Sequence, residues 1–243
     1  MKVYAITDIG KARPINEDSF YLPKETEPFC AVADGMGGHN AGEVASAMAI
    51  QAFAEAMRRS GKRTATAIHD AVLRANAAVY QEASRDSSKR GMGTTFTALV
   101  ADGRRVHIAH VGDSRIYRLR EGSLTQITQD HSLVEELVRA GLITREQART
   151  HPRRNIITRA LGTHGENEPD LLVTDVQDGD VFLLCTDGLT GMVTDAQIER
   201  MLLENDMEAA ADALLAAALD AGGRDNVTLI LCERRGASAW NRD

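Results

Sequence analysis

The sequence predicts an α+β fold in which two antiparallel sheets stack on each other and helices cover the outer face of each. The first observation is a pair of Asp-Gly turns, Asp102-Gly103 and Asp178-Gly179, each flanked by strand patterns, as in β-hairpins. The second is the division of the helical patterns into two groups, at residues 40–83 and 195–221. Because hairpins build antiparallel sheets and each sheet has an apolar face to cover, two helical groups fit two stacked sheets.

Short apolar and β-branched runs place the strands. The expected strands lie at residues 2–8, 19–22, 29–33, 94–100, 106–111, 115–120, 171–176, 181–185 and 227–232. Residues 115–120 are expected to continue the ladder of 106–111. The turn at Asp178-Gly179 is expected to join 171–176 to 181–185 as a hairpin.

The early helical group contains two amphipathic helices. Residues 40–60 place Val44, Met48 and Ala52 on one side, which is the spacing of a helix that buries one face. The second helix repeats this spacing from Ile68 to Val79. Both helices are therefore expected to pack on a sheet.

Residues 131–160 fit neither pattern. Capping boxes at Ser132 and at Thr144 predict two short helices, and a basic loop follows them. We interpret this segment, called the flap below, as a small insertion over the edge of a sheet. Residues 1–235 are expected to form a single domain that includes the flap, and the short polar tail at 236–243 is expected to be disordered.

Composition narrows the class of protein. The formal net charge of -7 over 243 residues argues against nucleic-acid binding, because no basic stripe is available to neutralise phosphates. Cys30, Cys185 and Cys232 all lie in apolar strand patterns and form no CxxC pair, so we expect buried thiols in a reducing compartment. With no secretory or membrane-spanning pattern in the sequence, we expect a cytoplasmic protein without membrane insertion.

Three apolar runs each deliver an aspartate. They lead to Asp34, Asp113 and Asp187, and Asp225 stands just before the last strand, so that an antiparallel neighbour would bring it to the same sheet end. A single Asp-Gly is most often only a turn, which is our interpretation of Asp102 and Asp178. Several such strands together favour a carboxylate-rich site, and oxygen-only sites suit magnesium or manganese.

The glycine-rich loop after Asp34 also allows nucleotide binding as an alternative. From Gly37 the spacing to Gly42 matches a P-loop, but Glu43 and Val44 stand where Lys and Ser or Thr are required. The loop also lacks the third glycine and the βαβ context of a dinucleotide fingerprint. Both nucleotide-binding interpretations therefore fail.

Arg13 is the strongest candidate for binding phosphate. It stands beside Pro14 in a loop that leads to Glu17-Asp18, and a guanidinium next to metal ligands is suited to bidentate phosphate binding. By contrast, His107 and His110 lie inside a strand pattern and are interpreted as structural.

Six short blocks, taken together, resemble one family. They are Arg13-x-x-Asn16-Glu17-Asp18, Asp34-Gly-Met-Gly-Gly-His39, Gly93-Thr-Thr, Gly112-Asp-Ser-Arg115, Asp187-Gly188 and Gly223-Arg-Asp225-Asn226. Their order and spacing are similar to those of the metal-dependent protein serine/threonine phosphatases of type 2C, in particular the compact bacterial members. The resemblance implies a four-layer αββα sandwich with two Mn²⁺ or Mg²⁺ ions between the sheets.

The resemblance also implies a role for each matching residue. Asp34 would bridge the two ions, Asp187 and Asp225 would complete the shell of one, and the Gly35 carbonyl with Glu17 and Asp18 would serve the other. Asp113 matches a position that holds a third, weaker ion together with Asp187. Arg13 would bind the phosphate, and the flap would lie near the site.

The implied reaction is hydrolysis of phosphoserine and phosphothreonine by water activated between two cations, without a phosphoenzyme. One position departs from the pattern. Family members in eukaryotes often carry a histidine two residues after the bridging aspartate, and here Met36 stands there and cannot donate a proton. His39 or a metal-bound water is then the expected acid.

Two other functions compete with a general phosphatase. One is an inactive adaptor that keeps the fold, which loss of the ligand acids would favour, although every one of these acids is present. The other is a narrow regulator of a single phosphoprotein. In either active form the expected partners are phosphorylated proteins and a cognate Ser/Thr kinase, and we expect a monomer.

Overall fold

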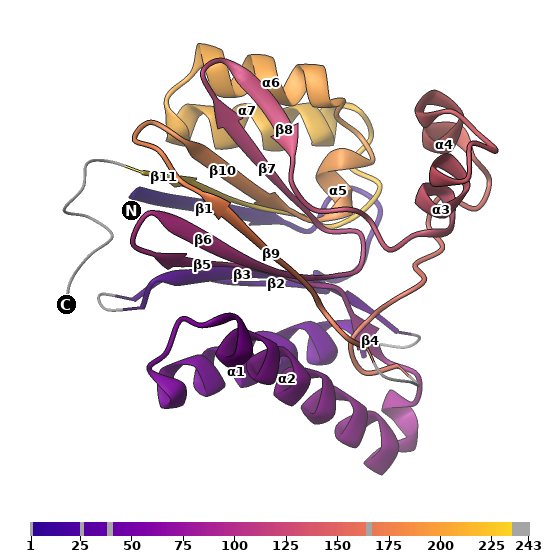
Figure 1. The fold of residues 1–243 in the computed structure, drawn as a ribbon. Coiled ribbons are helices and arrows are strands. Elements are labelled where there is room, and N and C mark those ends of the chain that lie inside the picture. Colours follow the sequence, from indigo (N-terminus) through magenta and orange to yellow (C-terminus); the bar gives the residue numbers. More distant parts are fainter. Residues whose placement is uncertain (1, 25–26, 38–40, 164–166, 235–243) are drawn as a thin grey trace.

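The computed structural model describes residues 2–24, 27–37, 41–163 and 167–234 and shows two stacked sheets (Figure 1). The first sheet has the order β1 (Lys2–Asp8), β11 (Val227–Glu233), β10 (Val181–Cys185), β7 (Arg115–Arg120) and β8 (Ser123–Gln126). The second has the order β2 (Asp18–Tyr21), β3 (Phe29–Met36), β5 (Phe96–Asp102), β6 (Arg105–Val111) and β9 (Asp170–Asp175), with β4 (Gly93–Thr94) paired to β3. All these pairings are antiparallel.

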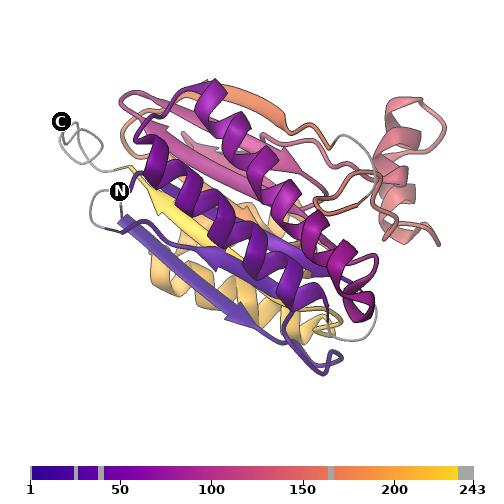
Figure 2. The same cartoon turned by 90° about the horizontal axis from the view of Figure 1, so that it is seen from below.

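Helices cover the outer face of each sheet. The second sheet is covered by α1 (Gly42–Ser60) and α2 (Ala65–Arg85), which Figure 2 shows crossing its outer face. The first is covered by α6 (Asp195–Glu204) and α7 (Met207–Asp220), while the short α5 (Asp187–Thr190) directly follows β10 and a 3₁₀ turn at Ser87–Lys89 follows α2. The predicted four-layer αββα sandwich is confirmed. Within the described ranges no helix has the length and apolarity to cross a membrane.

Alternation along the strands explains the layers. In β3, Cys30 and Val32 point into the core between the sheets, whereas Ala31 and Ala33 point toward α1 and α2. This is the period of two that lets a sheet bury both faces. The three cysteines are buried free thiols, as predicted, and the Sγ atoms of Cys30 and Cys232 lie 3.4 Å apart across the two sheets.

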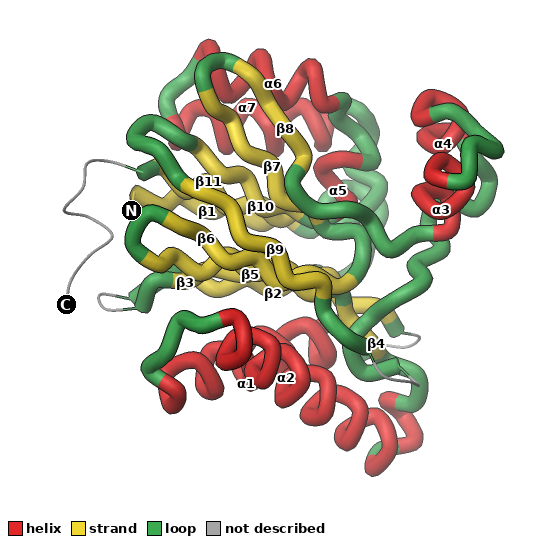
Figure 3. Tube along the Cα trace, in the orientation of Figure 1, coloured by secondary structure: helices red, strands yellow, loops and turns green. Residues whose placement is uncertain are grey.

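The flap contains α3 (Leu133–Arg139) and α4 (Arg145–Thr150), which stand apart from the sandwich (Figure 3). The capping box at Thr144 is confirmed, with both of its hydrogen bonds formed. The one at Ser132 is half formed. The hydroxyl of Ser132 accepts from the backbone N–H of Glu135, but the Glu135 carboxylate instead accepts from Gln129 at 3.1 Å. The tail at 236–243 lies outside the described residues.

Two predicted connections within a sheet are wrong, and the first is the ladder from 106–111 to 115–120. Strand β6 pairs with β5 and β9, whereas β7 pairs with β10 and β8 in the other sheet. The chain crosses between the sheets at Gly112–Ser114, where Gly112 has a φ of +111° that a side chain rarely adopts. The crossing places Asp113 between the sheets.

The second is the hairpin at Asp178-Gly179. Strand β9 is an edge of the second sheet and β10 lies inside the first, so this connection also crosses between sheets. Its acids bind other parts of the chain: Asp178 accepts from Arg234 Nε at 2.9 Å, and the buried Asp180 accepts from Arg120. These ion pairs hold the connection between the two sheets in place. Asp178 is therefore more than a turn residue.

Candidate functional site

The acids that the sequence singled out gather at one end of the gap between the sheets. Asp187 lies two residues after the end of β10 and Asp225 two residues before β11. These strands pair antiparallel, so both residues come to the same sheet end. Asp18 and Asp34 face each other across the pairing of β2 with β3. The Thr186 hydroxyl donates to Asp18 Oδ2 at 2.9 Å and so connects the two sheets at this end.

Two threonines hold the backbone of Asp34. The amide of Asp34 donates to Thr95 Oγ1 at 2.8 Å, and the Asp34 carbonyl accepts from the Thr94 hydroxyl at 2.9 Å. The Thr95 hydroxyl also lies 2.8 Å from that of Ser114, next to Asp113. The threonines were noticed in the sequence only as part of a block, and their role in holding Asp34 was not predicted.

Asn226 holds the loop that carries Arg13 and Glu17. Its Oδ1 accepts from the Glu17 amide at 2.8 Å. Its Nδ2 donates to the carbonyls of Ile9 and Ile15, each at 2.9 Å. One amide side chain therefore fixes three points of this loop against the start of β11.

The glycines after Asp34 allow a close approach of the backbone to Glu17. A Cβ at Gly35 would lie 2.1 Å from the Gly42 carbonyl oxygen, and one at Gly42 would lie 2.3 Å from Glu17 Oε1. No larger residue fits at either position. Glu43 follows in the first turn of α1 and adds an acid that sequence reasoning did not assign to the site; its negative charge contributes to the raised pKa of Glu17, behind burial as the largest cause.

Burial and mutual repulsion make the carboxyls harder to ionise. Burial raises the pKa of Asp18 to about 7 and that of Asp187 to about 6. The charge of Asp225 adds to both shifts, whereas a hydrogen bond with Asp34 opposes the one at Asp187. The pKa of Asp34 is raised well above its usual range by burial and then by the charges of four nearby aspartates: Asp18, Asp187, Asp113 and Asp225. Burial likewise raises the pKa of Asp113. This cost would be relieved by positive charge among the acids.

The donor set fits a hard divalent cation. Buried oxygens of Asp18, Asp113 and Asp187 have no hydrogen-bond partner among the described residues, which is uncommon for buried carboxylates. All are oxygen donors, the type that Mg²⁺ and Mn²⁺ prefer. As the side chains of the described residues now lie, no three acids, thiols or imidazoles surround one point closely enough to hold an ion. Binding would therefore require small side-chain rotations.

Arg13 lies at the rim of this cluster. Its Nη2 donates to Asp225 Oδ2 at 2.7 Å, and its side chain is 45% exposed. The hydrogen bond to Asp225 raises the pKa of Arg13, so the guanidinium stays charged. Its position allows it to reach an anion that approaches the acids from solvent.

A cleft of about 280 Å³ leads from Asp113 and Asp187 to the flap. The flap contributes Val134, Val138 and Arg149 to its wall. The position of the flap near the site, which the resemblance implied, therefore agrees with the geometry. Met36 is half-buried and pairs with Gly93, and His39 lies outside the described residues.

His110 is structural, as predicted. It is fully buried, with Nδ1 2.9 Å from the Thr97 hydroxyl and Nε2 3.0 Å from the Gln129 carbonyl. The described residues thus satisfy both ring nitrogens, which leaves neither for a ligand.

Comparisons with known proteins agree with this geometry. The family model for protein phosphatase 2C matches residues 12–225. The serine/threonine phosphatase stp of Listeria innocua serovar 6a is 41% identical over 236 residues, which cover 94% of each chain.

Solved structures are similar as well. The crystal structure of the Mycobacterium tuberculosis serine/threonine phosphatase PstP/Ppp has a TM-score of 0.90 at 41% identity, covering 97% of this chain and 99% of that one. A structure of the PstP catalytic domain in complex with two manganese ions has a TM-score of 0.87 at 39% identity and covers 97% of this chain and 98% of that one.

Proposed function

This chain belongs to the protein phosphatase 2C family, and from that premise we propose that it hydrolyses phosphoserine and phosphothreonine in proteins at a centre of two Mn²⁺ or Mg²⁺ ions. The observation that carries the proposal is the cluster of Asp18, Asp34, Asp113, Asp187 and Asp225, in which Asp18, Asp113 and Asp187 each have a buried oxygen without a partner among the described residues. A relative of the same fold is described with two manganese ions.

We assign the ligands as the resemblance implies. Asp34 would be shared by the two ions, and Asp187 and Asp225 would hold one of them. Glu17, Asp18 and the Gly35 carbonyl would hold the other, directly or through water. Asp113 would hold a third, weaker ion with Asp187. Bound divalent cations supply Lewis-acid stabilisation of phosphoryl oxygens and acidify water, which is the chemistry that the reaction needs.

The protein's own groups orient the substrate. Arg13 binds the phosphate, and its hydrogen bond to Asp225 aims the guanidinium across the acids. Thr94, Thr95 and Asn226 hold the backbones that carry the acids, so these side chains need little rearrangement. The flap cleft receives the polypeptide on either side of the phosphorylated residue.

An adaptor without activity is not favoured, because all the ligand acids are present and cluster. Whether the enzyme serves many phosphoproteins or one is set by surfaces outside the acid cluster. We further propose a cognate Ser/Thr kinase as the opposing enzyme, a monomeric state, a cytoplasmic location, and a single catalytic domain over residues 1–235.

The direct test is dephosphorylation of a phosphothreonine peptide. Activity is expected to vanish in excess EDTA and to return with manganese, and less fully with magnesium. A calcium-loaded sample controls for a merely structural effect of divalent charge. Undiminished turnover in excess chelator would overturn the proposal.

A further inference from the structure

The loop that carries Asp113 is held from both sides by two consecutive residues at the entrance of the flap. His131 binds the backbone of Gly112, one residue before Asp113, through two hydrogen bonds. Asp130 binds the side chain of Arg115, two residues after it. Hydrogen bonds on one side of Asp113 and an ion pair on the other therefore hold the short crossing between the sheets.

The grip on Gly112 is a closed pair of hydrogen bonds. The His131 amide donates to the Gly112 carbonyl at 2.7 Å, and the Gly112 amide donates to His131 Nδ1 at 3.0 Å. Because Nδ1 accepts, a neutral His131 carries its ring hydrogen on Nε2, which lies 3.1 Å from Asp170 Oδ2; the Arg159 guanidinium contacts the same nitrogen. His131 is only 6% exposed, so this geometry has little competition from water.

The grip on Arg115 is a bidentate ion pair. Arg115 Nη2 and Nε lie 2.7 and 2.9 Å from the two oxygens of Asp130, and that carboxylate is 10% exposed. Such fork-like pairs fix direction as well as distance. Arg115 Nη1 also donates to the Tyr117 hydroxyl at 2.9 Å, which anchors the guanidinium on β7.

His131 also fastens the exit of the flap. The Thr158 amide donates to the His131 carbonyl at 2.8 Å, and the Arg159 guanidinium contacts the His131 ring. Arg159 Nη1 donates to Asp170 Oδ1 at 2.9 Å. The two ends of the flap and the Gly112 peptide therefore meet at one residue, His131, through its backbone and its ring.

Asp113 itself has few restraints. Its Oδ1 is buried with no hydrogen-bond partner among the described residues, so its direction depends on the backbone on either side. The Gly112 backbone lies close to Thr95, since a Cβ added at Gly112 would be only 2.6 Å from the Cβ of Thr95. The loop therefore has little room to shift toward the second sheet. Ser114 is held by the hydroxyls of Thr95 and Thr97 on the second sheet, and Asp130 and His131 hold the crossing from the side of the flap.

We propose that Asp130 and His131 are positioning residues for Asp113 and that they couple the orientation of the flap to this acid. The inference rests on the proposed function, in which Asp113 holds an ion. Neither residue touches the substrate in this account; each acts through the backbone or the side chain that flanks Asp113.

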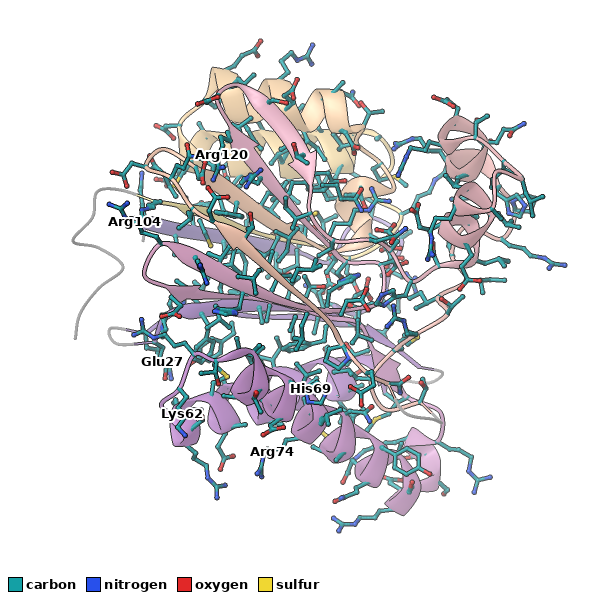
Figure 4. All side chains as sticks on the ribbon, viewed as in Figure 1. Glu27, Lys62, His69, Arg74, Arg104 and Arg120 are labelled. Carbon is teal, nitrogen blue, oxygen red and sulfur yellow. The ribbon has the colours of Figure 1, made fainter. Side chains whose placement is uncertain are left out.

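Two variants of His131 separate positioning from simple structural loss. In His131→Asn the amide oxygen takes the place of Nδ1 and can still accept from Gly112. In His131→Gln the side chain keeps its reach toward Asp170 but loses that acceptor. Asp130→Asn removes the charge that holds Arg115. His69→Gln, on α2, is a control for loss of a half-buried histidine that contacts neither Gly112 nor Arg115; its Nε2 lies 2.5 Å from Glu168 Oε2 (Figure 4).

Hydrogen exchange of the metal-free protein is the readout that does not depend on activity. Exchange at residues 111–116 is expected to accelerate in His131→Gln and to stay near wild type in His131→Asn and His69→Gln. If His131→Gln and His131→Asn exchange alike at these residues, while both melt as wild type does, the proposed grip is overturned.

Kinetics in two backgrounds then test the link to Asp113. With Asp113 present, His131→Gln is expected to raise the manganese concentration for half-maximal activity about fivefold, the effect of one lost hydrogen bond. In an Asp113→Ala background the same change is expected to have no further effect. Equal effects in both backgrounds would overturn the coupling. If Asp113→Ala alone matches wild type, the ion role proposed for Asp113 fails, and hydrogen exchange alone decides whether His131 holds the loop.

Discussion

Two of the segments that cross between the sheets, from β6 to β7 and from β9 to β10, each carry a buried aspartate. At the crossing from β9 to β10, Asp180 is 1% exposed and accepts from Arg120 Nε and Nη2 at 2.8 and 2.6 Å and from the Gln177 amide at 2.8 Å. At the crossing from β6 to β7, Asp113 is 7% exposed and has an oxygen with no partner among the described residues. Figure 4 shows Arg120 at the end of the sandwich away from the flap.

The presence or absence of a partner distinguishes aspartates that stabilise the fold from aspartates that are available to bind a ligand. A buried carboxylate that is paired with an arginine has its charge compensated. Removing the carboxylate destabilises the fold, because it leaves the arginine buried without a partner charge. A buried carboxylate among other carboxylates is destabilising until positive charge arrives. The comparison therefore predicts opposite effects on stability for two aspartates in similar positions of the fold.

The largest expected effect is on the activity of Asp34→Ala. Removing the bridging acid should lower kcat by about a thousandfold or more, as losing a main element of charge stabilisation does. The metal-free variant should be as stable as wild type or more so, because one buried acid in a repelling cluster is gone. Turnover on a phosphothreonine peptide and urea unfolding in EDTA measure the two. Wild-type turnover would contradict the bridging role. A large loss of stability would show that Asp34, like Asp180, stabilises the fold.

Asp180→Ala should have the opposite signature. The change leaves the Arg120 guanidinium without its main partner in a mostly buried place, and we expect the free energy of unfolding to fall by about 3 kcal/mol. Turnover per folded molecule should stay near wild type. Urea unfolding with and without manganese checks this, and a stability equal to wild type would remove the contrast with Asp113.

The sequence predicted the acids and the layers better than the path between sheets. Asp34 and Asp187 could be recognised in the sequence because each interrupts or follows an apolar run. A carboxylate at such a position is costly to bury unless it is paired or binds a cation. By contrast, alternation and turn residues look the same whether the chain turns back within one sheet or crosses to the other. For that reason the segment after Val111 and the turn at Asp178-Gly179 were both assigned to hairpin-like ladders.

A third test uses His110, a satisfied buried group near the base of the flap. Burial, and next the charge of His131, lower its pKa from 6.5 to about 4, while Asp130 and Asp170 oppose the shift. The unfolded chain then binds the proton more readily, so stability is complete above pH 6.5 and falls as the pH drops toward 4.

At pH 5 this histidine should account for a loss of about 2 kcal/mol relative to pH 7. The measurement is the difference in unfolding free energy between the two pH values for wild type and for His110→Gln. The variant should lack this part of the slope. Equal slopes in the two proteins would show that His110 is not held neutral.

The smallest expected effect is that of Arg13→Ala. Arg13 is exposed at the rim and has one acid partner, so its loss should barely change stability. Its absence should raise KM for a phosphopeptide about tenfold, the value of a charged hydrogen bond, with a smaller fall in kcat. Arg13→Lys, which keeps the charge without the fork, sharpens the test. An unchanged kcat/KM in Arg13→Ala would exclude it from the phosphate site.

Residues that support the site were less accessible to sequence reasoning. Thr95 holds Asp34 from 61 positions away, and Asn226 holds Glu17 from 209 positions away. His131 and Asp130 grip the Asp113 loop only because the chain returns to it after β8. None of these contacts has a local periodicity or spacing, and only the tertiary fold brings the partners together.

The account's central claim is that the unpartnered acids bind divalent cations, and a calorimetric titration of the metal-free protein with manganese tests it most directly. Wild type is expected to bind two ions tightly and to melt at a higher temperature once they are bound. Asp34→Ala is expected to lose tight binding and the rise in melting temperature, while His69→Gln keeps both. Manganese binding by Asp34→Ala equal to that of wild type, in number of ions and affinity, would contradict the claim.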